Sequence, residues 1–248
     1  LNNLFGFGNE MIPLIIKSKK ITKPEDVKKL AKLNKTEWVT ELTNAKGKNI
    51  TPEDKNSISL FASNMVRKME NDFPTLAFTA QLEREKKPLF KNQKNILSFL
   101  NVYDDFDLKN DNIDHYLREK KVPQAESVAI KEELKSVQRI FKLTPNYSKT
   151  NAIRNQNIYS AQSIAALGET RFVNEIAPKA GLSSKEAKLI VKKAENINTA
   201  TMLIMGELQD TMRAMDMASL ETTTLAKKLE AVSKDFPNLK SLFKITDN

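Results

Sequence analysis

The chain has 248 residues, of which 40 are Lys or Arg, 31 are Asp or Glu, one is His and none is Cys, and its net charge at pH 7 is +9. With 40% hydrophobic and 29% charged residues it has enough apolar side chains for a core, which excludes wholesale disorder. The lack of Cys excludes disulfides, thiolate zinc sites, iron–sulfur clusters and Cys nucleophiles, and the single His excludes a His-rich metal site.

Helices separated by Pro, Gly and polar turns are predicted through the first half of the chain. The clearest start is at Thr51, which is followed by Pro52 and has Asp54 three residues on, the pattern of a capping box. Thr22 and Glu25 have the same spacing at the start of the first predicted helix. The acidic, Asn-rich segment 101–112 has no period and is expected to be a loop. The predicted helices are residues 21–33, 34–46, 52–72, 74–82, 96–100 and 113–117.

The second half of the chain contains the longest predicted helix. Ser183 and Glu186 open it, and it is expected over residues 184–217, which is about 50 Å at 1.5 Å per residue. Its apolar stripe is expected to face the body of the protein. The stripe consists of Ile190, Ala194, Ile197, Thr201, Ile204, Leu208, Met212 and Met215. The other predicted helical segments of this half are residues 125–143, 151–155, 160–167, 169–177 and 225–232.

No part of the sequence alternates between apolar and polar residues over more than a few positions, so the fold class is predicted to be all-α. An internal repeat suggests how the helices are arranged. Residues 33–42 align without gaps to residues 167–176, and the alignment places Trp38 opposite Phe172. In both copies two short helices precede a Gly-containing loop and a capped long helix. We therefore expect an elongated array of stacked helical hairpins, with one long helix in its C-terminal half, divided into subdomains 1–122 and 123–248.

The sequence predicts no catalytic, cofactor-binding or metal-binding residue. His115 stands beside Asp114 without other ligands nearby and is interpreted as a surface or packing residue. The Asp residues between 104 and 114 do not fit a calcium-binding loop, because a frame starting at Asp105 has Asn110 and Tyr116 where Gly and Glu are required. These Asp residues are interpreted as caps and turn residues.

Met residues are concentrated in the long helix. Met202, Met205 and Met217 lie off its apolar stripe and are the candidate interface residues. Two interpretations are open: soft filling of a core, or an adaptable face for another helix layer or subunit. The net charge is spread evenly, at +5 for residues 1–124 and +4 for 125–248, which makes nucleic-acid binding the less favoured function. No uncharged run is long enough to span a membrane, and Leu1 in place of Met suggests a piece of a longer chain.

Several segments, taken in order, resemble one family, the A component of bacterial insecticidal toxin complexes (Tc toxins). They are residues 73–78 (Phe-Pro-Thr-Leu-Ala-Phe), 105–108 (Asp-Phe-Asp-Leu), 138–145 (Gln-Arg-Ile-Phe-Lys-Leu-Thr-Pro), the apolar pairs within 160–173, and 236–243 (Phe-Pro-Asn-Leu-Lys-Ser-Leu-Phe). Lys244 stands where the family pattern has Gly.

The resemblance implies a helical shell region of a very large, secreted or cell-surface bacterial protein that forms homopentamers and injects a toxic enzyme into a host cell. The partners it implies are other domains and subunits of the same toxin, with no small-molecule substrate and no cofactor. On this basis the expected function is that of a non-catalytic structural module of a toxin-translocation assembly. The alternatives are a generic helical-repeat scaffold for protein–protein interaction and, less favoured, a nucleic-acid-binding helical domain.

Overall fold

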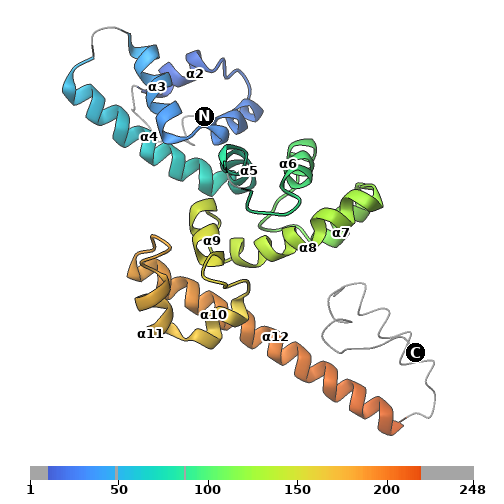
Figure 1. The fold of residues 1–248 in the computed structure, drawn as a ribbon. Helices are drawn as coiled ribbons and strands as arrows, with labels where there is room; N and C mark the ends of the chain where they lie inside the picture. Colours follow the sequence, from blue (N-terminus) through green and yellow to red (C-terminus); the bar gives the residue numbers. More distant parts are fainter. Residues whose placement is uncertain (1–10, 48–49, 87, 219–248) are drawn as a thin grey trace.

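The computed structural model describes residues 11–47, 50–86 and 88–218, with side chains described up to residue 210. Within these ranges the chain is helical or in turns and contains no strand, which confirms the all-α class. Figure 1 shows the helices following one another along an extended molecule, with the last one projecting from it. The elements are α2 (Met11–Ser18), η1 (Pro24–Lys32), α3 (Lys35–Lys46), α4 (Pro52–Asp72), α5 (Pro74–Arg84), α6 (Gln93–Val102), α7 (Ile113–Glu119), α8 (Gln124–Phe141), α9 (Tyr147–Arg154), α10 (Ala161–Leu167), α11 (Glu169–Arg171), η2 (Phe172–Ile176) and α12 (Ser184–Ala218).

Local capping explains where most of these helices begin. At α4 the hydroxyl of Thr51 accepts a hydrogen bond from the Asp54 amide at 3.1 Å, and the Asp54 carboxylate accepts one from the Thr51 amide at 3.0 Å. Asn34 and Glu37 form the same reciprocal pair at α3. Each pair satisfies two amides that have no partner inside the helix.

Two features of the N-terminal part differ from the predictions. The element after residue 21 is a 3-10 helix, η1, and its capping acid is Asp26, whose carboxylate accepts from the amides of Thr22 and Lys23. The spacing predicts Glu25 as the capping residue, but the acid that caps is the next residue, Asp26. The sequence reasoning also missed α2, which buries Ile12 and Ile15.

Buried apolar side chains form three clusters along the chain. The first joins α2, η1, α3 and α4, the second lies between residues 78 and 147, and the third runs from Ile140 to Ala194. The second cluster contains Val122 and Ile130 together. The predicted boundary at 122/123 therefore passes through a cluster and not between two clusters.

Polar contacts connect the first cluster to the second. Arg84 at the end of α5 donates to the carboxylate of Glu37 at 2.7 Å and to the carbonyl of Lys32 at 2.6 Å. Asn146, which caps α9, donates to the carboxylate of Glu70 on α4 at 2.9 Å. These contacts join the N-terminal helices to the middle of the molecule.

The two copies of the repeat share their anchors but differ in backbone. Trp38 and Phe172 are both fully buried, and Trp38 packs edge-on against Phe61 of the long helix α4. Gly47 and Gly181 both have positive φ after the second short helix of their copy. However, residues 169–176 form one short turn of α-helix followed by the π-helical η2. Gly168 stands where Asn34 caps α3 and offers no side chain for a cap.

Candidate interaction surface on the long helix

The N-terminus of α12 is held by a capping box and an ion pair. The Glu186 carboxylate accepts from the Ser183 amide at 2.9 Å, and the Ser183 hydroxyl accepts from the Glu186 amide at 3.3 Å. The same carboxylate accepts a 2.5 Å hydrogen bond from Nζ of Lys149 on α9. The Lys149 hydrogen bond, followed by those from Ser183, lowers the pKa of Glu186 to about 2. The start of α12 is thereby attached to the body at a defined position.

The proximal half of α12, residues 184–194, packs against α10 and η2. Ala187, Ile190, Val191 and Ala194 are all buried there, in the same cluster as Ile164 of α10. Ile190 and Ala194 are the first two residues of the predicted stripe, so the stripe faces the body over residues 184–194, as predicted.

The distal half, residues 195–218, leaves the body. The stripe continues as Ile197, Thr201, Ile204 and Leu208, which we call the distal stripe. Ile197 and Ile204 are each 45% exposed, and Thr201 is exposed. The expectation that the stripe faces the body as far as Met215 is therefore wrong at Ile197, Thr201 and Ile204. Leu208 is partly exposed, and the side chains of Met212 and Met215 lie outside the described residues.

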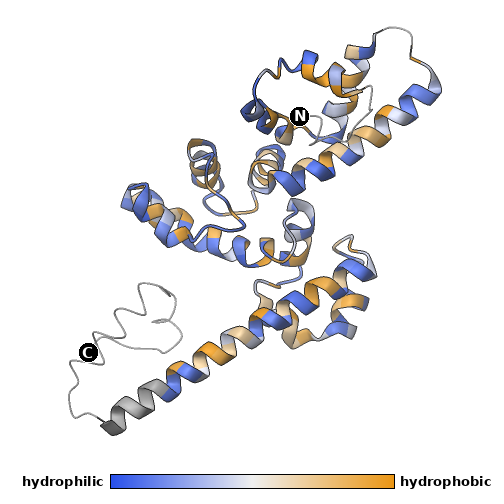
Figure 2. Ribbon diagram, turned by 180° about the vertical axis from the view of Figure 1, so that it is seen from behind, coloured by the Kyte–Doolittle hydropathy of each residue, from blue (hydrophilic) through white to orange (hydrophobic). Residues whose placement is uncertain are grey.

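The physical reason is a difference in helix length. α10 has seven residues, about 10 Å, whereas α12 has 35 residues, about 52 Å at 1.5 Å per residue. Since α10 and η2 are the elements that chiefly contact α12, they cover only its first turns. Figures 1 and 2 show the rest of the helix extending past the body, with hydrophobic residues continuing along it.

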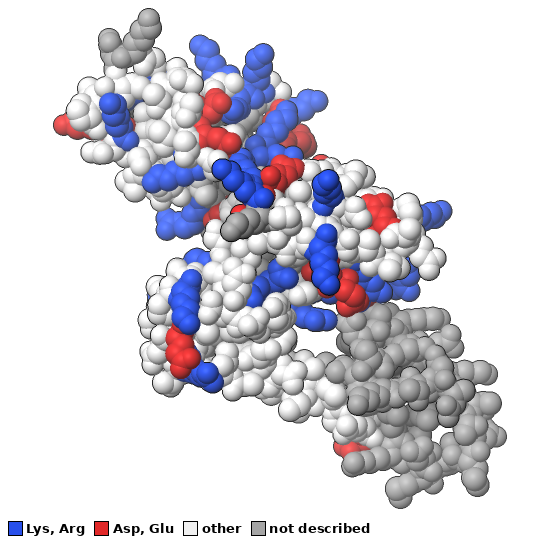
Figure 3. All heavy atoms as spheres, viewed as in Figure 1, with Lys and Arg blue, Asp and Glu red and all other residues white. Residues whose placement is uncertain are grey.

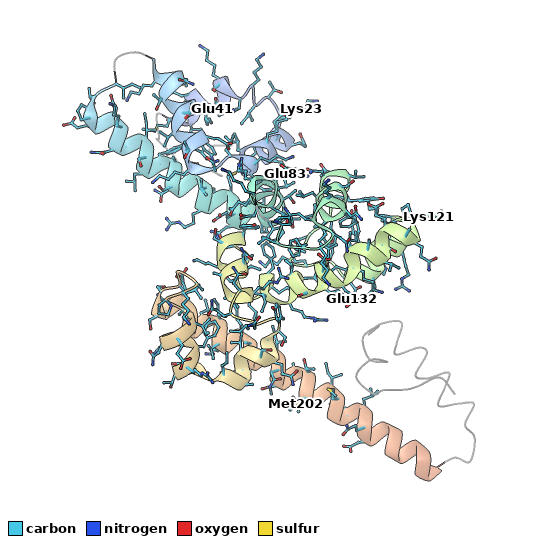
Figure 4. All side chains as sticks on the ribbon, in the orientation of Figure 1. Lys23, Glu41, Glu83, Lys121, Glu132 and Met202 are labelled. Atoms are coloured by element: carbon cyan, nitrogen blue, oxygen red, sulfur yellow. The ribbon has the colours of Figure 1, made fainter. Side chains whose placement is uncertain are left out.

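The candidate interface residues lie on this projecting part. Met202 is 62% exposed, Met205 is partly exposed, and the side chain of Met217 lies outside the described residues. Figure 4 places Met202 beyond the body. The sequence reasoning missed Leu203, which is 64% exposed next to Met202. Leu203 lies off the apolar stripe, so the helical period does not predict its burial. An apolar residue outside the stripe could itself have indicated an exposed contact site.

Charge also distinguishes the distal half. Residues 195–210 contain Glu195, Glu207 and Asp210 and no Lys or Arg, so this stretch carries −3 while the whole chain carries +9. Figure 3 shows Lys and Arg side chains over the N-terminal and middle helices, with Asp and Glu between them. The projecting helix is thus an apolar and acidic element on a basic body.

The acidic segment after α6 is held by internal contacts. Asp105 accepts hydrogen bonds from Tyr116 and Lys120, and Asp107 accepts from the amide of Lys109. Asp114 is buried and forms ion pairs with Lys131 and Lys135. Burial raises the pKa of Asp114, but hydrogen bonds from the two Lys side chains outweigh it, and the pKa is lowered overall.

His115 lies on the surface of α7, with Nδ1 3.5 Å from a carboxylate oxygen of Glu119. In the described ranges, no three His, Asp or Glu residues gather as metal ligands would. A hollow of about 320 Å³ is lined by residues including Glu70, Glu85 and Tyr147. Glu70 accepts from Gln81 and from Asn146, so its carboxylate serves the contact between helices.

The sequence analysis did not identify one partly buried cation, Arg154. Arg154 ends α9 and stacks over the ring of Phe90 at 5.0 Å and near that of Tyr159 at 6.0 Å. Burial lowers its pKa. No pattern in the sequence distinguishes this Arg from the exposed ones, because its burial depends on packing between α9 and the segment before α6.

Comparison of the chain with protein-family models, curated proteins and solved structures finds no match in any of the three. Among the described residues, no helix combines the length and the apolar character needed to cross a membrane.

Proposed function

We propose that this chain is a non-catalytic helical structural module that contacts other protein through the distal half of α12. The observation that carries the proposal is the exposed pair Met202 and Leu203, on a helix that projects from its own body. Solvent-exposed apolar side chains grouped on one element are typical of protein interfaces, and Met is adaptable enough to fit an uneven partner.

The resemblance to the A component of insecticidal toxin complexes suggests the parent assembly in which this module acts. In such a protein the module is part of the helical shell of a secreted or cell-surface pentameric assembly, built as an array of stacked hairpins. Its partners are other domains or subunits of the same toxin. The arrangement of three apolar clusters in sequence order is compatible with such an array.

Sedimentation velocity over a range of concentrations tests the interface. The wild-type chain is expected to self-associate as its concentration rises, and Met202→Lys is expected to weaken this association with unchanged helix content by circular dichroism. Val128→Lys is the matched control, because Val128 is exposed on α8, away from α12. Equal association of all three proteins would contradict the role of α12.

Electron microscopy of the full protein that contains this sequence tests whether the module belongs to a toxin assembly. Five copies around a central channel would support the toxin assembly, whereas a monomeric, non-ring particle would favour a generic helical scaffold. The nucleic-acid alternative predicts that the chain binds a labelled oligonucleotide and that its affinity falls steeply between about 50 and 200 mM salt.

A further inference from the structure

Arg154 is a cation that the body holds without an anion. The central carbon of its guanidinium, Cζ, lies 5.0 Å from the centre of the Phe90 ring and 6.0 Å from that of Tyr159. Its Nε is enclosed and has no hydrogen-bond acceptor, and within the described ranges the side chain forms no ion pair. Lys135 of α8 shows the usual arrangement of a buried cation, since its Nζ lies 2.8 Å from the carboxylate of Asp114. Arg154 therefore has hydrogen-bonding capacity that the described residues leave unused.

The surroundings of Arg154 favour one carboxylate as its ligand. Burial lowers the pKa of Arg154, and the nearby charge of Glu133 opposes this effect without outweighing it. The Glu133 carboxylate instead accepts hydrogen bonds from the main-chain and side-chain amides of Asn92, at 3.2 and 3.1 Å. Because Glu133 repels a second anion, a dianionic phosphate is opposed more strongly than a carboxylate. A planar guanidinium also matches a planar carboxylate through two parallel N–H···O bonds.

The site can be reached from the surface. Arg154 is partly exposed, and the side chain of Tyr159 beside it is 43% exposed. A partner that reaches Arg154 therefore meets an exposed aromatic ring next to an unpaired cation. The matching partner presents an apolar side chain next to a carboxylate.

The distal half of α12 presents this combination. Asp210 is exposed and, in the part of the chain that the structure describes, has no ion pair. It follows the exposed Leu203 by seven residues, so the two lie within about 20° of each other around the helix and about 10 Å apart along it. On the receiving side, 6.0 Å separate Cζ of Arg154 from the Tyr159 ring, and a charge-assisted hydrogen bond adds about 3 Å. The two spacings are compatible.

The carboxylate that reaches Arg154 comes from a different molecule. Residue 210 is 16 positions beyond Ala194, the last buried residue of α12 in the described ranges, which is about 24 Å along the helix. Figure 1 shows this half of α12 extending away from α9, where Arg154 lies. A second copy of the chain supplies both the carboxylate and the apolar side chain.

We propose that Arg154 binds the carboxylate of Asp210 from a second copy, while Leu203 of that copy packs against the ring of Tyr159. This inference rests on the proposed function, for which it names the partner and the receiving site.

A double-mutant cycle on the self-association of the full chain tests the contact. Arg154→Gln and Asp210→Asn are each expected to raise the dissociation constant about tenfold. The variant with both substitutions should lose no more than either single variant, because the two side chains act as one pair. Losses that multiply in the double variant would overturn the pairing. If Arg154→Gln loses helix content by circular dichroism, Arg154→Lys, which keeps the charge but not the two parallel bonds, takes its place in the cycle.

The matched controls are Arg139→Gln and Asp104→Asn, since both residues are exposed and change by the same charge. Both controls should leave the dissociation constant unchanged, and losses equal to those of the test variants would overturn the contact in favour of a general effect of charge. Met202→Lys separates this inference from the proposed function. If Met202→Lys weakens association and Asp210→Asn does not, the proposed function stands and the Arg154 contact is overturned. If the wild-type chain stays monomeric, both are overturned.

Acetate tests the receiving site without a second copy. In ¹H–¹⁵N spectra of the full-length Asp210→Asn chain, sodium acetate is expected to shift the Nε–H signal of Arg154 in a saturable way, whereas equal sodium chloride should not. Arg154→Lys identifies the signal by its loss. Inorganic phosphate should shift it less than acetate, because Glu133 repels the greater charge. No saturable shift with acetate would overturn the carboxylate site. A stronger response to phosphate would overturn it as well and would assign Arg154 to a phosphate group.

Discussion

Lys149 on α9 and Glu186 in the first turn of α12 are joined by a 2.5 Å hydrogen bond between Nζ and a carboxylate oxygen. The two residues are 37 positions apart in the chain. The same carboxylate caps Ser183, so one side chain both starts α12 and attaches it to α9. The contact therefore links the first turn of α12 to α9.

This contact predicts a dependence of stability on pH. Hydrogen bonds, first from Lys149, lower the pKa of Glu186 to about 2, below its ordinary value of 4.5. Because the folded state holds the carboxylate ionised, the stabilisation is present above pH 4.5 and is lost as the pH falls towards 2. Urea unfolding of wild type and Glu186→Gln should show a difference in unfolding free energy that shrinks between pH 4.5 and 2. A difference independent of pH would mean that Glu186 acts without its charge.

Trp38 provides a test of packing at the repeat. It is fully buried against Phe61, and its indole Nε1 has no hydrogen-bond partner. Trp38→Ala should cost about 3–5 kcal/mol of unfolding free energy, because it leaves a large cavity. Trp38→Phe should stay within about 1 kcal/mol of wild type, since the lost volume is offset by removal of an unsatisfied N–H. Chemical denaturation of both variants measures this, and a large loss in Trp38→Phe would reveal a partner for the indole N–H.

Lys121 predicts a stabilising substitution. It has φ of 51° in the turn after α7, and the amide of Val122 bonds back to the carbonyl of Leu117. This left-handed position at a helix end favours Gly. Lys121→Gly should raise the unfolding free energy by about 0.5–1 kcal/mol, whereas Arg118→Gly, within the helical part of α7, should lower it by a similar amount. Thermal and urea unfolding distinguish the two, and equal losses in both variants would contradict the geometry.

Helix identity and many helix starts were accessible from sequence because they depend on neighbouring residues. Thr51 and Asp54 cap α4 through contacts three residues apart, and a capping box of that kind needs nothing from the rest of the chain. The length of α12, Ser184–Ala218, was predicted as 184–217 for the same reason. The short helix α2 was missed, since Pro13 and an almost continuous apolar run give no 3.6 period.

The point at which α12 leaves the body could not be predicted from the sequence. An apolar stripe indicates that a face is suited to burial, but the length of the covering helix decides how much of it is buried. α10 ends after seven residues at Leu167, so Ile190 is buried and Ile204 is exposed although both belong to one stripe. Of the candidate interface, the exposure of Met202 was anticipated from its place off the stripe, while Leu203 was found only in the structure.

Val191 and Met202 give the sharpest test of where α12 leaves the body. They are 11 residues apart, which is about three turns, so both lie on the same side of the helix. Val191 is 1% exposed and Met202 is 62% exposed. Val191→Lys should therefore lower the unfolding free energy by about 4 kcal/mol or more, because it places a charge inside an apolar cluster. Met202→Lys should change it by no more than about 0.5 kcal/mol, as surface substitutions usually do. Urea unfolding followed by circular dichroism measures both. Comparable losses in the two variants would show that the distal half is packed against the body in solution, and the interface role of Met202 would then be withdrawn.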